Sequence, residues 1–156
     1  MESLSTLHVV VLFLLLGVVV TACTRRAMPR PVKTVVADAS VVMAADGTLR
    51  EDIGIETLGG ILTVLLPAGY DVPCSKAETF STAHDNQQFI DITLYRGRTR
   101  LVKDCTLLGK YRLCGIPEQP HGQPQIRVSF EVTPGGIAIY AQDVQRKQNV
   151  AIAAAE

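Results

Sequence analysis

Residues 125–132 read QIRVSFEV, and this stretch carries the pattern that decides the fold. Ile126, Val128, Phe130 and Val132 occupy every second position, and a polar residue stands before each of them. Successive side chains of a strand point to opposite faces, so this alternation predicts a strand with one buried side and one solvent-facing side. The β-branched residues strengthen the prediction, because they pack well on a pleated surface.

The same period-two pattern recurs along the chain. In residues 89–95, Ile90, Ile92 and Leu94 share one face, and the polar Asp91 and Thr93 share the other. Further strands are expected at residues 61–66, 78–82, 107–113, 137–141 and 149–153. Turn-forming Gly, Pro, Asn and Asp separate these runs, a spacing that is typical of a sandwich of antiparallel sheets. We therefore predict an all-β fold, with one antiparallel β-sandwich over residues 53–152 and a short tail over residues 153–156.

The charge balance and the cysteines argue against several function classes. Fifteen Lys and Arg balance fifteen Asp and Glu, so nothing indicates nucleic acid as a partner. The cysteines form no CxxC pair and the three histidines are scattered, so we expect neither a metal nor a cofactor. No nucleophile–base pair or carboxylate pair stands out, so we do not expect an enzyme. The sequence leaves the disulfide state of Cys74, Cys105 and Cys114 open; Cys105 and Cys114 are a possible pair after export.

The N-terminal residues are typical of a membrane-targeting segment. Residues 9–20 read VVVLFLLLGVVV, and no charge occurs between Glu2 and Arg25. The apolar run ends in VTAC at residues 20–23, which resembles the lipobox of bacterial lipoproteins. This resemblance implies that Cys23 is acylated and that the domain faces the periplasm or the cell surface. Basic residues follow the run, which favours the alternative of an uncleaved signal-anchor with the domain in the cytoplasm. A mis-assigned gene start is the third alternative.

Residues 24–52 are expected to form a tether of low order between the targeting segment and the sandwich. Pro29 and Pro31 open the stretch, and Asp46-Gly47 is a turn signal within it. Short strands at Val35-Val36 and at residues 41–43 are the only regular structure that its composition suggests.

Four further motifs resemble one known domain. Residues 52–60 read DIGIETLGG and residues 80–87 read FSTAHDNQ. Leu108-Gly109 is followed by Gly115-Ile116-Pro117, and residues 122–126 read GQPQI. In this order and spacing, the set is similar to the peptide-binding domain of the DnaK-type (heat-shock protein 70 family) chaperones. The resemblance implies a β-sandwich that binds extended apolar segments of unfolded polypeptides.

The resemblance also implies which residues form the site. By position, the hydrophobic pocket corresponds to Ile55, Thr57, Leu58, Ile61, Phe80, Ala83, Ile90, Ile92 and Ile126. Leu58 and Ala83 stand where the family forms an arch over the peptide. Thr57, Ser81 and Gln87 stand where polar groups hold the peptide main chain.

Other features of the family have no counterpart in this sequence. No glycine loop suited to phosphate occurs, residues 45–51 lack the apolar run of the family's linker, and little sequence follows the last expected strand. Asp85 matches a position that pairs with the family's helical lid, so it is expected to have no partner, and His121 replaces a latch Arg. These departures imply a membrane-tethered holdase without ATP coupling, although a separate ATPase partner stays unknown. The alternatives are an adaptor lipoprotein whose cleft binds one fixed partner segment, and a non-functional chaperone fragment.

Overall fold

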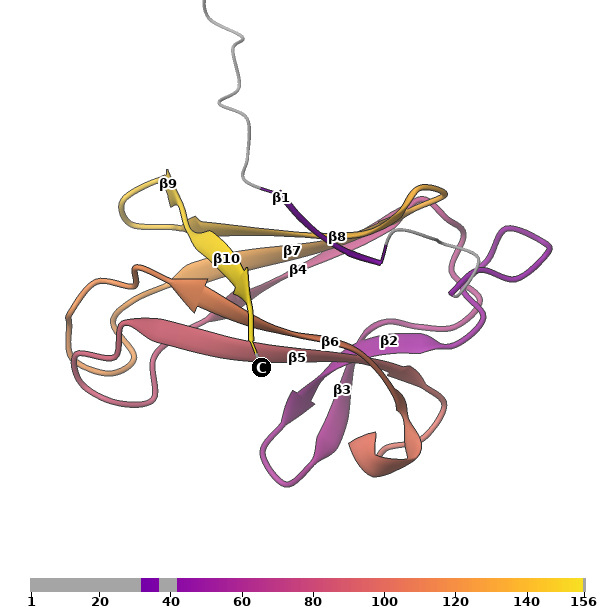
Figure 1. Cartoon of the computed structure of the whole chain (residues 1–156), viewed down its shortest axis with the longest axis horizontal. Coiled ribbons are helices and arrows are strands. Elements are labelled where there is room, and N and C mark those ends of the chain that lie inside the picture. The colour runs from indigo at the N-terminus through magenta and orange to yellow at the C-terminus, as the bar shows by residue number, and fades with distance from the viewer. Residues whose placement is uncertain (1–31, 37–41, 156) are drawn as a thin grey trace, which may run out of the picture. The chain divides into compact units, whose positions relative to one another are not determined.

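The computed structural model describes residues 32–36 and 42–155, and these residues form two antiparallel β-sheets (Figure 1). The first sheet has the order β1-β8-β7-β4, with β9 paired to β8. Its strands are β1 (Val32–Val36), β4 (Cys74–Phe80), β7 (Ile126–Thr133), β8 (Gly136–Asp143) and β9 (Gln148–Asn149). The second sheet has the order β10-β6-β5-β2-β3. Its strands are β2 (Asp52–Thr57), β3 (Ile61–Leu66), β5 (Phe89–Gly97), β6 (Thr106–Cys114) and β10 (Ala151–Ala154).

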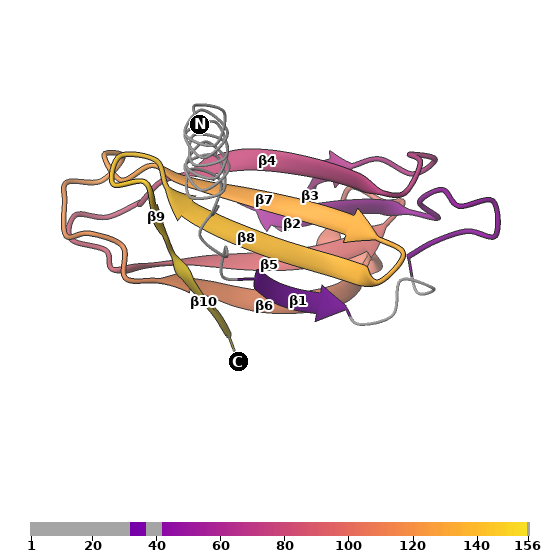
Figure 2. The same ribbon diagram turned by 90° about the horizontal axis from the view of Figure 1, so that it is seen from above.

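The core lies between the two sheets, and the period-two residues fill it. Figure 2 shows β7 and β8 lying over β5 and β6. All four apolar residues of β7 are fully buried, and Ile90, Ile92 and Leu94 of β5 are 7, 3 and 0 % exposed. Each such side chain contributes roughly 1.5–3 kcal/mol when it leaves water. The all-β prediction and the predicted inward faces of both strands are therefore confirmed.

β2 was not among the predicted strands, although Ile53 and Ile55 stand two positions apart. Its apolar residues Ile53 and Ile55 flank Gly54, and the β2–β3 register shifts between Ile53 and Gly54. A Cβ atom on Gly54 would collide with the carbonyl oxygen of Thr63 on β3. Only glycine therefore permits this close pairing of β2 with β3.

The boundaries of two predicted strands differ from the structure. The strand expected at residues 78–82 lies at Cys74–Phe80, where it forms the edge of the first sheet and has partly exposed side chains on both faces. The strand expected at residues 149–153 is two short strands, because β9 pairs with β8 and β10 pairs with β6. The chain changes sheets at Val150, which is buried.

The prediction of a low-order tether is wrong for residues 42–52. Residues 42–50 form a hairpin, in which the Ala44 amide donates to Thr48 and the Arg50 amide donates to Val42. The hairpin docks on residues 69–72 through backbone bonds, and Val42 and Leu49 are each 2 % exposed. β1 also pairs with β8, so the fold begins before Ile53. The expected targeting segment, with Cys23, lies outside the described residues; within them, no helix is long and apolar enough to cross a membrane.

The three described cysteines carry free thiols. Cys105 directly precedes β6 and Cys114 ends it, so the whole strand separates them. A strand of this length spans on the order of 30 Å, whereas disulfide-bonded Cα atoms lie within about 7 Å. A bond between Cys105 and Cys114 is therefore incompatible with this fold.

Candidate functional site

β2 and β5 separate where the predicted peptide-binding residues gather. The two strands pair from Asp52 opposite Gly97 to Ile55 opposite Leu94, and their pairing ends there. Beyond this point, β2 pairs only with β3 and β5 only with β6 in the part of the chain that the structure describes. Figure 1 shows the β2–β3 hairpin turning away from β5. One backbone edge at residues 56–57 and one at residues 89–93 are thus left without a strand partner, an arrangement that we call the β2–β5 fork.

Five of the predicted pocket side chains belong to the apolar cluster behind this fork. Ile55, Ile90, Ile92 and Ile126 are buried members of the cluster, and the half-buried Phe80 packs against it. Ile126 has no exposed surface, whereas Ile55 and Ile90 are each 7 % exposed. Ile126 therefore supports the cluster from β7, and the residues of β2 and β5 are the ones nearer to solvent.

Leu58 and Ile61 lie on the β2–β3 hairpin, apart from that cluster. Leu58 is 100 % exposed at the turn, where Gly59 and Gly60 adopt φ values of +86° and +69°. Ile61 is half-buried, pairs with Thr57 and forms an isolated bridge with Leu101. Burial of apolar surface is favourable, so a Leu exposed at a hairpin tip is available to a binding partner.

The predicted polar residues make bonds within the protein. The Thr57 hydroxyl donates to the Ile61 carbonyl at 3.2 Å. The Gln87 side-chain oxygen accepts from the amides of Ala83 and His84 at 3.0 and 3.2 Å, and its Nε2 donates to the Phe89 carbonyl at 2.6 Å. Gln87 therefore shapes the loop of residues 81–88, and the Ala83 amide already has a partner.

A second segment, residues 116–124, holds the 81–88 loop in place. The Ser81 hydroxyl donates to the Pro124 carbonyl at 2.6 Å. Three backbone bonds also join the two segments: Asn86 N to Gln119 O at 2.9 Å, Ile116 N to Gln88 O at 3.0 Å, and Gly122 N to Thr82 O at 3.0 Å. The loop with the predicted polar residues thus depends on a segment that contains none of the predicted site residues.

The expectation that Asp85 has no partner is wrong. Its Oδ1 atom accepts from the His121 amide at 2.8 Å and lies 2.8 Å from His121 Nδ1. The backbone bond from His121, then its side-chain bond, lower the pKa of Asp85 from the usual range, and the charges of His121 and His84 add to this effect. The two positions that the resemblance assigns to a lid contact therefore contact each other.

Comparison with known sequences identifies the domain. The family model described as Hsp70 protein matches residues 46–156. The chain belongs to the Hsp70 family. The heat shock cognate 70 kDa protein 3 of Dictyostelium discoideum is 46 % identical over 97 residues, which are 62 % of this chain and 15 % of that protein.

The Hsp70 match begins at Asp46, within the docked hairpin, and covers every described strand except β1. β1 is thus an extra strand relative to the matched region, and it covers the edge of β8 from Ile137 to Tyr140. The resemblance to a DnaK-type β-sandwich is confirmed by both the match and the fold. The chain spans only about 15 % of the length of the curated relative.

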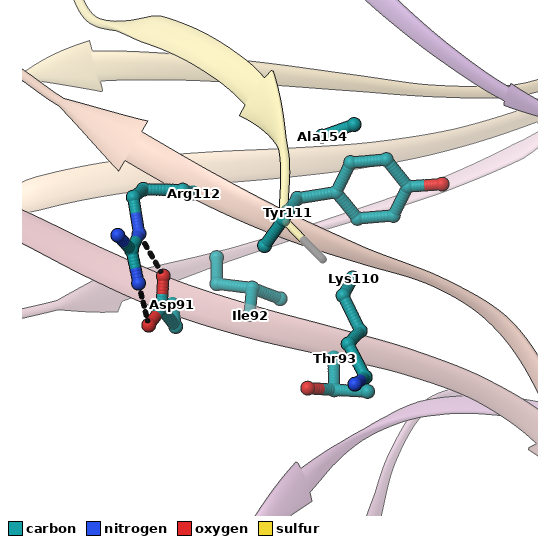
Figure 3. A pocket seen from close by; sticks show the side chains of 8 residues that line it. Asp91, Ile92, Thr93, Lys110, Tyr111, Arg112 and Ala154 are labelled. Carbon is teal, nitrogen blue, oxygen red and sulfur yellow. Dashed lines mark hydrogen bonds and ion pairs between the residues drawn. The ribbon is translucent and has the colours of Figure 1, made fainter.

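The second sheet has a cavity that the sequence did not indicate. Figure 3 shows the cavity, which has a volume of about 610 Å³ and is lined by residues of β5, of β6 and of the end of β10. Arg112 donates to both carboxylate oxygens of Asp91, at 2.7 and 2.8 Å, and also lies 4.0 Å above the Phe89 ring. The bond from Arg112 lowers the pKa of Asp91. Ile92 is the one predicted site residue in its lining, so this cavity is not the predicted pocket.

Proposed function

We propose that this chain binds short extended peptide segments with apolar side chains, as a chaperone-like holdase that catalyses no reaction. The β2–β5 fork carries this proposal, because it leaves an edge of each of two strands without a strand partner, beside an apolar cluster. An extended peptide that adds to free strand edges gains main-chain hydrogen bonds that are indifferent to its sequence. A nearby apolar surface then selects side chains such as Leu, and membership of the Hsp70 family supports this mode of binding.

Fluorescence anisotropy with the full-length chain in a mild detergent tests the proposal. A labelled Leu-rich peptide should bind in the micromolar range, and a peptide with the same length but charged residues in place of Leu should bind much more weakly. Ile90→Phe places a larger, aromatic side chain among tightly packed ones, and such overpacking lowers the stability of a protein by about 1–3 kcal/mol. This variant should abolish binding, provided that circular dichroism shows that it is still folded. Unchanged affinity in a folded Ile90→Phe variant would count for the adaptor alternative instead.

We propose that binding is independent of ATP. The two Gly-Gly pairs of the described residues lie in the β2–β3 turn (Gly59-Gly60) and at the β7–β8 turn (Gly135-Gly136). Neither pair precedes a helix N-terminus, where backbone amides bind phosphate. Peptide affinity should therefore be the same with and without Mg²⁺ and ATP. An ATP-dependent change of threefold or more, in the purified chain alone, would contradict this part of the proposal.

We propose that an acylated Cys23 tethers the domain to a membrane. The apolar residues 9–20 followed by the VTAC sequence support this proposal. Globomycin, which blocks the lipoprotein signal peptidase, should cause a larger precursor to accumulate. Cys23→Ala should prevent processing and acylation. If Cys23→Ala instead keeps the size and the membrane association of the wild type, the uncleaved signal-anchor is the correct alternative.

A further inference from the structure

Asp85 and His121 form the one ion pair between the 81–88 loop and the 116–124 segment in the described residues. Both side chains are exposed, at 66 and 70 % respectively, so neither is held by burial. The Asp85 carboxylate accepts from both the backbone and the ring of His121, although the two residues are 36 positions apart. The pair therefore depends on charge and hydrogen bonding rather than on packing.

The loop that the pair holds is the one with the predicted peptide-contacting residues. Ser81, Ala83 and Gln87 all lie within residues 81–88, which directly precede β5 in the chain. Three of the bonds that join this loop to residues 116–124 run from backbone to backbone and do not change with pH. The Asp85–His121 bond is different, because an imidazole gains and loses its charge between about pH 5 and 8.

We propose that Asp85 and His121 act as a charge-dependent clasp that positions the 81–88 loop, so that the affinity for peptide is highest near pH 5–6 and decreases toward pH 8. This inference rests on the proposed peptide-binding function. Protonated His121 attracts the carboxylate and donates from Nδ1, whereas neutral His121 contributes no charge. Acidification well below pH 4 weakens the clasp again, because it protonates Asp85.

Two other ionisable groups lie beside the clasp. His84, on the same loop, acts on Asp85 through its charge. Glu118, on the facing segment, accepts a hydrogen bond from the Gln88 side chain. Substitutions at residue 121 leave both groups in place, so they isolate the contribution of His121.

The test compares His121→Arg with His121→Gln in the full-length chain. The probe is a labelled Leu-rich peptide with blocked termini and no histidine, and its affinity is measured at pH 5.5 and 8.0. The wild type should bind about two- to fivefold more tightly at pH 5.5, the effect expected of an exposed ion pair. His121→Arg keeps the charge at both pH values, so its affinity should be high and nearly independent of pH. His121→Gln should bind more weakly, with most of the pH dependence lost. A wild-type pH profile in His121→Gln would overturn the proposal.

A second measurement separates the clasp from peptide binding itself. Hydrogen exchange of the peptide-free chain reports on the Asn86 and Gly122 amides, whose bonds join the two segments. Their protection factors at pH 8.0 should be higher in His121→Arg than in the wild type, and lower in Asp85→Asn. Equal protection in all three proteins would refute the clasp even if peptide binds. Failure of every protein to bind peptide, with the protection factors as expected, would refute the proposed function and leave the clasp intact.

Discussion

Leu58→Ala is the sharpest test of where a peptide binds, because Leu58 contributes no burial to the fold. The side chain is 100 % exposed at the tip of the β2–β3 hairpin. The substitution should therefore change the free energy of unfolding by less than about 0.5 kcal/mol, as at other exposed sites. The glycines that shape the turn are not altered. A loss of peptide affinity in this variant reports on contact with the peptide and not on a loss of structure.

The expected loss of affinity follows from the carbon atoms removed. Leu58→Ala deletes three carbon groups, each worth about 0.8 kcal/mol when fully buried. A hairpin tip that covers a peptide from one side buries roughly half of that surface, so the loss is about 1.2 kcal/mol. Since about 1.4 kcal/mol corresponds to a tenfold change, the Kd should rise about five- to tenfold.

Anisotropy with a labelled Leu-rich peptide measures this change, and Val144→Ala is the matched control. Val144 is also an exposed apolar residue, at 48 %, but it lies between β8 and β9 on the other sheet. The hydrogen bond from its backbone amide to the Gln125 carbonyl remains in the alanine variant. Val144→Ala should leave the Kd unchanged. Equal affinities for Leu58→Ala, Val144→Ala and the wild type would show that peptide does not contact the hairpin, and the reasoning from the β2–β5 fork would fail.

Three further predictions concern stability, measured by urea unfolding. Ile126→Ala should destabilise the fold by about 2–5 kcal/mol, because Ile126 is fully buried; a loss below 1 kcal/mol would mean that the site relaxes freely. Gly54→Ala should prevent stable folding, since its Cβ would collide with the β3 backbone. Gly115→Ala (φ +77°, with open space) should lower the free energy of unfolding by only about 1–2 kcal/mol. Arg112 lowers the pKa of Asp91. The difference in stability between the wild type and Asp91→Asn should therefore be constant above about pH 5 and disappear as the pH decreases through the lowered pKa of Asp91. A stability difference that is the same at every pH would contradict this assignment.

The sequence predicts strands well where one face is fully buried and poorly elsewhere. β7 and β5 follow period two because their inward residues fill the core between the sheets. β4 is an edge strand with partly exposed residues on both faces, so its side chains carry a weak pattern and its predicted start was four residues late. In β2, the need for glycine at residue 54 comes from the backbone of another strand, and the sequence of β2 alone does not reveal it.

The hairpin of residues 42–50 shows a different limit of sequence reasoning. Its local composition is that of a linker, and Asp46-Gly47 was correctly predicted as a turn. Its order comes from bonds to residues 69–72 and from burial of Val42 and Leu49, neither of which leaves a periodic signal in so short a segment. Long-range contacts, rather than local propensity, make this segment part of the domain.

The Asp85–His121 contact shows why a resemblance predicts positions better than partners. When each residue is compared with the family on its own, Asp85 and His121 both correspond to positions that contact the helical lid. Asp85 is then expected to be unpaired. Two groups that are placed to meet one external partner must themselves lie close together, and here their charges are complementary. A carboxylate, an amide N–H and an imidazole at this distance form hydrogen bonds with one another without any third element. Where the resemblance implies a permanently charged Arg, His121 carries an imidazole that can gain and lose its charge, and the proposed clasp depends on this difference.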